Sequence, residues 1–100
     1  MDQYLEKHSD PRKTPALLNV IAGAYQAFQD TRTAAYYYRW IAEKYPDYEG
    51  VARVRYELAE CYDDNKMRDK ALEQYTILKD SFSATSYGQM GQKKFDQHRF

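Results

Sequence analysis

Two stretches of the sequence decide the fold: AGAYQAFQDTRTAAYYYRWIAEKY at residues 22–45 and AECYDDNKMRDKALEQYTILKDSF at residues 59–82. A shift of 37 residues superimposes them and matches residues of similar size and polarity. The matched pairs are Ala22 with Ala59, Tyr25 with Tyr62, Ala34 with Ala71, Tyr38 with Tyr75, Ile41 with Leu78, and Tyr45 with Phe82. Such a period is typical of proteins that stack one supersecondary unit on the next.

Within each copy, apolar residues recur at intervals of three and four, which is the spacing of one helix face. In the first copy they are Leu17, Leu18, Ile21, Ala22, Tyr25 and Phe28, then Ala34, Tyr38, Ile41, Ala42 and Tyr45. The second copy has Val54, Leu58, Ala59, Cys61 and Tyr62, then Ala71, Leu72, Tyr75 and Leu78. Polar breaks at 29–31 and 63–66 separate the helices, and Asp30 or Thr31 is placed to cap the second helix. The pattern predicts an all-α fold of helix hairpins.

The repeat reaches both ends of the chain. YLEKHSD at residues 4–10 is a fading copy of IAEKYPD at residues 41–47. We therefore expect residues 1–13 to form a partial N-terminal helix, 14–47 the first repeat, 48–83 the second, and 84–100 a C-terminal capping helix that starts near residue 86. Together they make one domain.

Composition excludes several classes of function. The 100 residues carry 15 Lys and Arg against 15 Asp and Glu, so no chain-wide charge recruits nucleic acid, and no apolar run is long enough for membrane insertion. The single cysteine, Cys61, cannot form an internal disulfide and is expected to be a buried packing residue. His8 and His98 lack ligand-spaced partners, and no catalytic constellation is present. We expect neither an enzyme nor a metal or other cofactor.

The spacing of small and aromatic residues resembles the tetratricopeptide repeat. The first copy matches that family's pattern at Leu18, Ile21, Ala22, Tyr25, Ala34, Tyr38, Ile41 and Pro46, and the second at Leu58, Ala59, Tyr62, Ala71, Tyr75 and Leu78. Arg55 stands where a large apolar residue is usual, and Ser83 where Pro is usual. The 37-residue period and KYPDYEGVARVRYELAECYDD at residues 44–64 are similar to bacterial Tol-Pal coordinator and outer-membrane assembly lipoproteins.

The resemblance implies a right-handed α-solenoid of two full repeats flanked by partial capping helices. It also implies a protein-interaction module or scaffold that binds a partner peptide or helix in a concave groove. The groove positions carried over are Asn19, Gly23, Gln26, Arg53, Tyr56, Glu60, Asp63, Lys93 and Lys94. Gly23 either lets a ligand backbone approach or allows close helix packing. Chaperone adaptors of this family clamp a carboxylate, but Glu57 stands at one clamp position here, which argues against that role.

A second candidate surface is convex. Tyr36 and Trp40 lie four residues apart on the second helix, next to Arg39, and aromatic rings beside Arg are typical of interfaces. The alternative is that both rings pack against the N-terminal partial helix. The alternative function is a structural module that self-associates into a homo-oligomer, through exposed aromatic rings or through the ends of the array. A complete chain would be cytoplasmic, and one excised from an envelope protein would be periplasmic.

Overall fold

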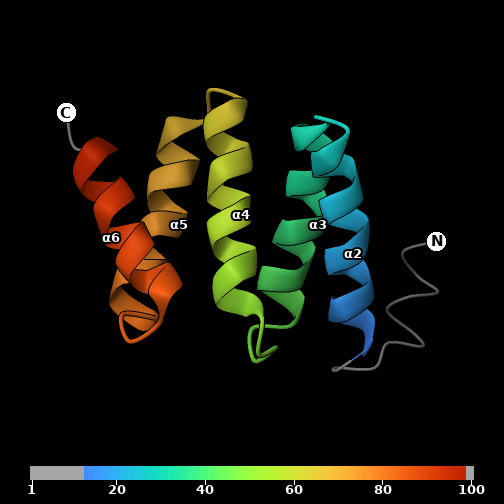
Figure 1. Cartoon of the computed structure of the whole chain (residues 1–100), viewed down its shortest axis with the longest axis horizontal. Coiled ribbons are helices and arrows are strands. Elements are labelled where there is room, and N and C mark those ends of the chain that lie inside the picture. The colour runs from blue at the N-terminus through green and yellow to red at the C-terminus, as the bar shows by residue number, and fades with distance from the viewer. Residues whose placement is uncertain (1–12, 99–100) are drawn as a thin grey trace.

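The computed structural model describes residues 13–98, and every regular element in that range is a helix. The five helices are α2 (Lys13–Ala27), α3 (Thr31–Lys44), α4 (Val51–Asp64), α5 (Arg68–Ser81) and α6 (Ser86–His98). Each helix packs against the next along the chain, so the helices stand side by side in sequence order (Figure 1). The predicted all-α array of helix hairpins is thus confirmed. Of the partial helix expected over residues 1–13, residues 1–12 lie outside the described range, and Lys13 belongs to α2.

The two hairpins turn in the same way, one repeat apart. Gln29 and Lys66, 37 residues apart, both adopt a left-handed backbone conformation, with φ of 65° and 63°. In each turn the next residue donates its backbone N–H to a tyrosine carbonyl five residues back, from Asp30 to Tyr25 at 2.9 Å and from Met67 to Tyr62 at 2.8 Å. This is the Schellman geometry that satisfies the last carbonyls of a helix.

The predicted cap is also present, at Asp30. Its Oδ1 accepts a hydrogen bond from the backbone N–H of Thr33 at 3.2 Å. The corresponding residue of the second hairpin, Met67, has no side chain able to cap. Asn65 ties the two turns together, because its Nδ2 donates to Thr31 Oγ1 at 3.0 Å and to the Cys61 carbonyl at 2.8 Å.

One continuous core runs through the helices and alternates small residues with large ones. Tyr38 and Tyr75, at the same position of the two copies, are both fully buried. The core consists of Leu18, Ala22, Ala34, Ala35, Tyr38, Ile41, Ala42, Ala52, Val54, Leu58, Ala59, Cys61, Tyr62, Ala71, Tyr75 and Leu78. The small residues let neighbouring helices approach, and the two phenols fill the space between them.

The apolar stripe expected on the first helix is only partly buried. Leu18 and Ala22 are inside, whereas Leu17, Tyr25 and Phe28 are 53%, 38% and 85% exposed. Tyr25 corresponds to Tyr62, which is 8% exposed because α3 and α5 flank α4. Within the described residues, α3 is the only helix that makes an extended contact with α2. The outer side of α2 therefore faces solvent across these residues.

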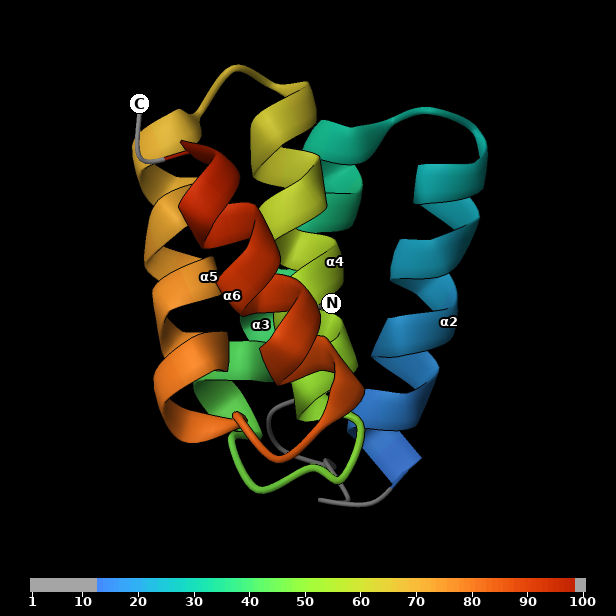
Figure 2. The ribbon, with the colours of Figure 1, turned by 60° about the vertical axis from the view of Figure 1, so that its left-hand side comes forward.

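The last helix approaches α5 and α4 closely. Figure 2 shows α6 crossing in front of α5 and α4, with α2 standing apart on the other side of α4. Gly91 is buried against α5, where an added Cβ would lie 2.7 Å from Leu78 Cβ. Gly88 faces the carbonyl of Phe82 so closely that an added Cβ would overlap it. Glycine thus sets the close approach of α6 to the array.

Candidate functional site

The predicted groove residues lie on the helices α2, α4 and α6, and the structure brings several of them together. Gln26 of α2 is central to the first group. Its Oε1 accepts a hydrogen bond from the Tyr38 hydroxyl at 2.8 Å, and its Nε2 donates to Glu57 Oε2 at 2.7 Å. A single side chain therefore links α2, α3 and α4.

The same contact recurs in the second copy. The Tyr75 hydroxyl donates to Asp63 Oδ2 at 3.2 Å, and both residues stand 37 positions after the Tyr38–Gln26 pair. The buried tyrosine of each hairpin thus projects its hydroxyl to a polar residue on the first helix of that hairpin. This arrangement satisfies a buried phenol, as burial requires.

The α4–α6 side of the groove is held by one ion pair and a cluster of rings. Lys94 Nζ lies 3.8 Å from Glu60 Oε1, with both side chains about one third exposed. The Tyr56 ring lies between the rings of Tyr75 and Tyr87, with centroid distances of 6.2 Å and 6.0 Å. The structure thus brings Glu60 together with Lys94, and it links Tyr56 to Asp63 through the buried Tyr75.

The remaining predicted groove residues lack such links or are simply exposed. Arg53 and Lys93 are exposed. Asn19 Oδ1 is buried and has no hydrogen-bond partner among the described residues. An added Cβ at Gly23 would meet only the Tyr38 hydroxyl, at 3.9 Å, which is ordinary van der Waals contact. Close helix packing therefore does not explain the glycine at position 23.

Burial and acidic neighbours raise the pKa of the tyrosines around this groove. Desolvation and then Glu57 raise the pKa of Tyr38 to about 12. Desolvation also raises the pKa of Tyr56, with added effects of the hydrogen bond and charge of Glu60. The pKa of Tyr75 is raised chiefly by desolvation and then by Glu60. These phenols are neutral hydrogen-bond donors at physiological pH.

We expect the fold to lose stability in alkaline solution. A raised folded-state pKa means that the neutral phenol stabilises the fold below pH 10, and that this stability is lost as pH rises from 10 towards 12. Thermal midpoints measured across that window should fall steadily. In Tyr38→Phe the fall should be shallower, because one titrating group is gone. Tyr36→Phe, which removes a half-exposed hydroxyl, is the control. Equal slopes for Tyr38→Phe and the parent would contradict the expectation.

The two rings predicted for the convex surface take different places. Trp40 is partly buried and stacks on Tyr37, which stacks in turn on Tyr25 of α2, with centroid distances of 6.3 Å and 5.8 Å. Tyr36 is 51% exposed and meets Tyr37 and Trp40 edge-on. Tyr36 is therefore the more accessible of the two. The alternative of packing against the N-terminal partial helix concerns residues outside the described range.

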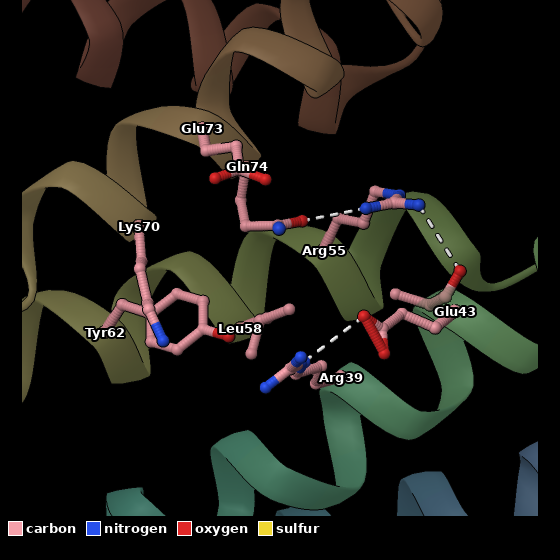
Figure 3. Close-up of a pocket in the computed structure, with 9 residues that line it drawn as sticks. Arg39, Glu43, Arg55, Leu58, Tyr62, Lys70, Glu73 and Gln74 are labelled. Atoms are coloured by element: carbon pink, nitrogen blue, oxygen red, sulfur yellow. Dashed lines mark hydrogen bonds and ion pairs between the residues drawn. The ribbon is translucent and has the colours of Figure 1, made fainter.

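A further surface, which the sequence analysis did not identify, is a cleft between α3 and α5 with α4 as its floor. We call it the α3–α5 cleft. One hollow of about 180 Å³ is lined by charged side chains from all three helices (Figure 3), namely Arg39, Glu43, Arg55, Lys70 and Glu73. A second hollow of about 200 Å³ shares Arg39, Tyr62 and Lys70 with the first and adds Arg32, Tyr36 and Met67.

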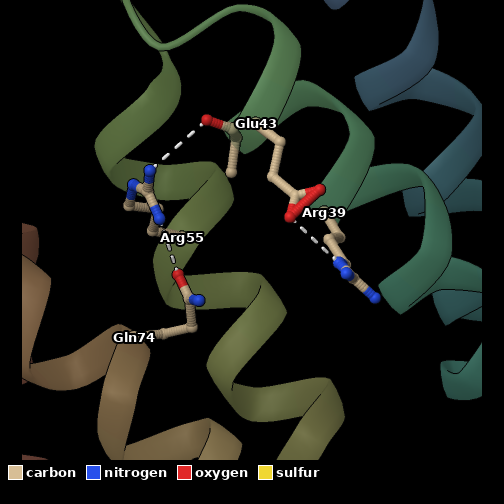
Figure 4. A network of polar contacts seen from close by, with 5 residues as sticks. Arg39, Glu43, Arg55 and Gln74 are labelled. Atoms are coloured by element: carbon tan, nitrogen blue, oxygen red, sulfur yellow. Dashed lines mark hydrogen bonds and ion pairs between the residues drawn. The ribbon is translucent and has the colours of Figure 1, made fainter.

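Arg55 is held at the floor of this cleft by neutral acceptors. Its guanidinium donates to Gln74 Oε1 at 2.9 Å and to the Ala42 carbonyl at 3.3 Å (Figure 4). Burial lowers the pKa of Arg55, although Glu43 and Glu73 oppose that effect. The sequence analysis singled out three residues of this cleft without bringing them together: Tyr36 and Arg39 as part of a convex contact surface, and Arg55 as a departure from the pattern of the family that the chain resembles.

Other kinds of site receive little support from the described residues. Cys61 is buried, and desolvation followed by the charge of Glu57 raises the pKa of its thiol to about 12, which is the opposite of what a nucleophile needs. Between residues 13 and 98, no cluster of three His, Cys, Asp or Glu side chains is placed to hold a metal ion. Among the described helices, none has both the length and the apolar character needed to cross a membrane.

Comparisons with known proteins found no match for the chain among family models, curated proteins or solved structures.

Proposed function

We propose that this chain is a non-enzymatic protein-interaction module of the tetratricopeptide kind, and that it binds a partner's peptide or helix against α2, α4 and α6. The observation that carries the proposal is a row of half-buried carboxylates on one face of α4, namely Glu57, Glu60 and Asp63. Glu57 is bonded to the neutral amide of Gln26. Glu60 already pairs with Lys94, and Asp63 accepts a hydrogen bond from Tyr75. A carboxylate has further acceptor positions beyond one such bond, so a row of three favours a ligand with basic side chains.

The α2 side of the same face supports backbone recognition. Gly23 presents no side chain, and an added Cβ would meet only the Tyr38 hydroxyl, at 3.9 Å. A peptide backbone could therefore approach α2 at this position, beside the carboxylate row. Asn19 lies one helical turn earlier, but its Oδ1 is buried and lacks a hydrogen-bond partner among the described residues, so a ligand would reach it only if the side chain turned outward.

A pair of peptides tests this proposal. The basic peptide GKKLKKFG is titrated into ¹⁵N-labelled protein, with GQQLQQFG as the neutral control. We expect the basic peptide to shift amide resonances on α2, α4 and α6. Glu57→Gln keeps the shape of the side chain and is expected to raise Kd about fivefold or more, which is a loss of about 1 kcal/mol. Tyr56→Ala should also weaken binding, because it removes an aromatic contact.

Glu73→Gln is the matched control, since it removes the same charge from α5 on the cleft side. Its Kd should stay within about twofold of the parent. Unchanged affinity in both Glu57→Gln and Tyr56→Ala would contradict the proposal that the peptide binds in the groove. Equal binding of the basic and neutral peptides would remove the proposed role of the carboxylate row.

A further inference from the structure

The α3–α5 cleft lies apart from the predicted groove residues of α2, α4 and α6. Its lining residues come from α3, α4, α5 and the turn before α5, and none comes from α2 or α6. The residues of α4 divide between the two surfaces. Arg55, Leu58 and Tyr62 line the cleft, whereas Tyr56 and Glu60 contact α5 and α6 on the groove side. A ligand in one surface therefore leaves the other accessible.

The charges of the lining residues indicate which kind of ligand the cleft binds. The hollow beside Tyr36 is lined by Arg32, Arg39 and Lys70, and none of the described residues that line it is a carboxylate. Arg39 also pairs with Glu43 at 3.2 Å, but both side chains are more than half exposed. An exposed ion pair at this helical spacing contributes little to stability, so Arg39 can turn towards another anion. The three cations favour an anionic ligand.

Arg55 adds a partly desolvated cation at the adjoining floor. Its two acceptors, Gln74 Oε1 and the Ala42 carbonyl, are both uncharged. A guanidinium has five N–H donors, so Arg55 can donate to a carboxylate while it keeps its hydrogen bonds to Gln74 and Ala42. Glu43 and Glu73 line the same hollow as Arg55, so the charge at the floor is mixed. The hollow beside Tyr36 is the part of the cleft whose charge favours an anion.

The cleft is also lined by apolar and aromatic side chains, which indicate a ligand with an apolar part. Tyr36 is half exposed and Met67 is 38% exposed, and both line the hollow that holds the three cations. Lys70 Nζ lies over the Tyr62 ring, 5.8 Å from its centroid. At about 200 Å³ the hollow is smaller than the sites that enclose whole small molecules, and it suits one or two amino-acid side chains.

From these observations we infer that the α3–α5 cleft is a second binding site, which takes an acidic peptide segment. In this site a carboxylate side chain pairs with Arg32, Arg39 and Lys70, and an adjacent apolar side chain packs against Tyr36 and Met67. The peptide GEELEEFG, with GQQLQQFG as its uncharged counterpart, is the probe. Titrated into ¹⁵N-labelled protein, GEELEEFG is expected to shift resonances of α3, α5 and the Asn65 side-chain amide, which lines the hollow.

Two double variants locate the effect. Arg32→Gln with Lys70→Gln removes exposed cations from the cleft and is expected to raise Kd about tenfold or more. Arg53→Gln with Lys93→Gln removes the same charge from exposed positions on α4 and α6, and its Kd should stay within about twofold. Thermal melting confirms that both variants fold. An equal loss in both would show general charge attraction and overturn the site.

Two further outcomes would also overturn it. The first is equal binding of GEELEEFG and GQQLQQFG, because the carboxylates would then contribute nothing. The second is displacement of GEELEEFG by a single-stranded oligothymidylate whose own binding is weakened by Arg32→Gln with Lys70→Gln. The cleft would then be a site for polyanions in general rather than for acidic peptides. If the basic peptide does not bind to α2, α4 and α6 while the acidic peptide binds to the cleft, the proposed groove is contradicted and the proposed cleft site is supported.

Discussion

Leu58→Ala is expected to lower the free energy of unfolding by about 2–5 kcal/mol, because the substitution removes buried methyl groups and leaves a cavity. Leu58 is fully buried on α4, the middle helix of the described array, and helices pack against α4 from both sides. A domain of this size has a total stability of about 5–15 kcal/mol. The loss would therefore take a large share of it. Urea denaturation followed by far-UV circular dichroism measures the change.

Leu17→Ala is the matched control for that experiment. It makes the same chemical change at a leucine that is 53% exposed on the outer side of α2. Its effect should lie within about 0.5 kcal/mol of the parent, as for surface positions in general. A loss comparable to that of Leu58→Ala would mean that the outer side of α2 is covered in solution, contrary to the exposure described above.

The second large effect concerns two glycines, at which substitution by alanine is expected to change the stability of the protein in opposite directions. Gly91→Ala should destabilise the protein by about 1–3 kcal/mol, which is the usual cost of forcing an extra methyl group into a packed interface. The added Cβ would lie 2.7 Å from Leu78 Cβ and 3.3 Å from the Tyr75 carbonyl oxygen, and a carbonyl cannot move aside without disturbing α5. The expected consequence is that α6 shifts away from α5.

Gly23→Ala should instead stabilise the protein by up to about 1 kcal/mol, because alanine favours the helix and the site has room for a methyl group. Thermal and urea melts of the two variants against the parent measure both effects. The same substitution should weaken binding of the GKKLKKFG peptide if its backbone approaches Gly23. A destabilised Gly23→Ala, or a stabilised Gly91→Ala, would contradict the packing described for α2 and α6.

Much of the fold was predictable because the same residue pattern occurs in both copies of the repeat, so a helix or core position inferred in one copy could be compared with the matched position in the other. Tyr38 and Tyr75 match across 37 residues, and both fill the core beside matched alanines. The predicted cap at Asp30 is present, since a short acidic side chain before a helix has few other backbone partners. The left-handed turns at Gln29 and Lys66 were not predictable, because neither residue is a glycine or an asparagine.

Burial on the first helix was predicted less well than on its repeat. The apolar spacing of Leu17, Tyr25 and Phe28 matches a packed helix, but spacing shows only that a face is apolar and not what covers it. The polar contacts were missed for a related reason. Gln26 and Glu57 are 31 residues apart, and their bond depends on how α2 and α4 converge. Likewise the cleft needs Arg32, Arg55 and Lys70 from three helices, which no local pattern brings together.

The two end helices of the described array have unlike outer surfaces. From residue 14 to residue 29 the sequence has no charged residue, and Leu17, Val20 and Phe28 lie exposed there. On α6 the exposed residues include Gln89, Gln92, Lys93 and Asp96, with Met90 as the exposed large apolar residue. Burying the outer side of α6 would strip water from charges, whereas burying the exposed side chains of α2 would cover apolar groups. The two ends of the described array are therefore not equivalent as contact surfaces, which gives the stack a polarity.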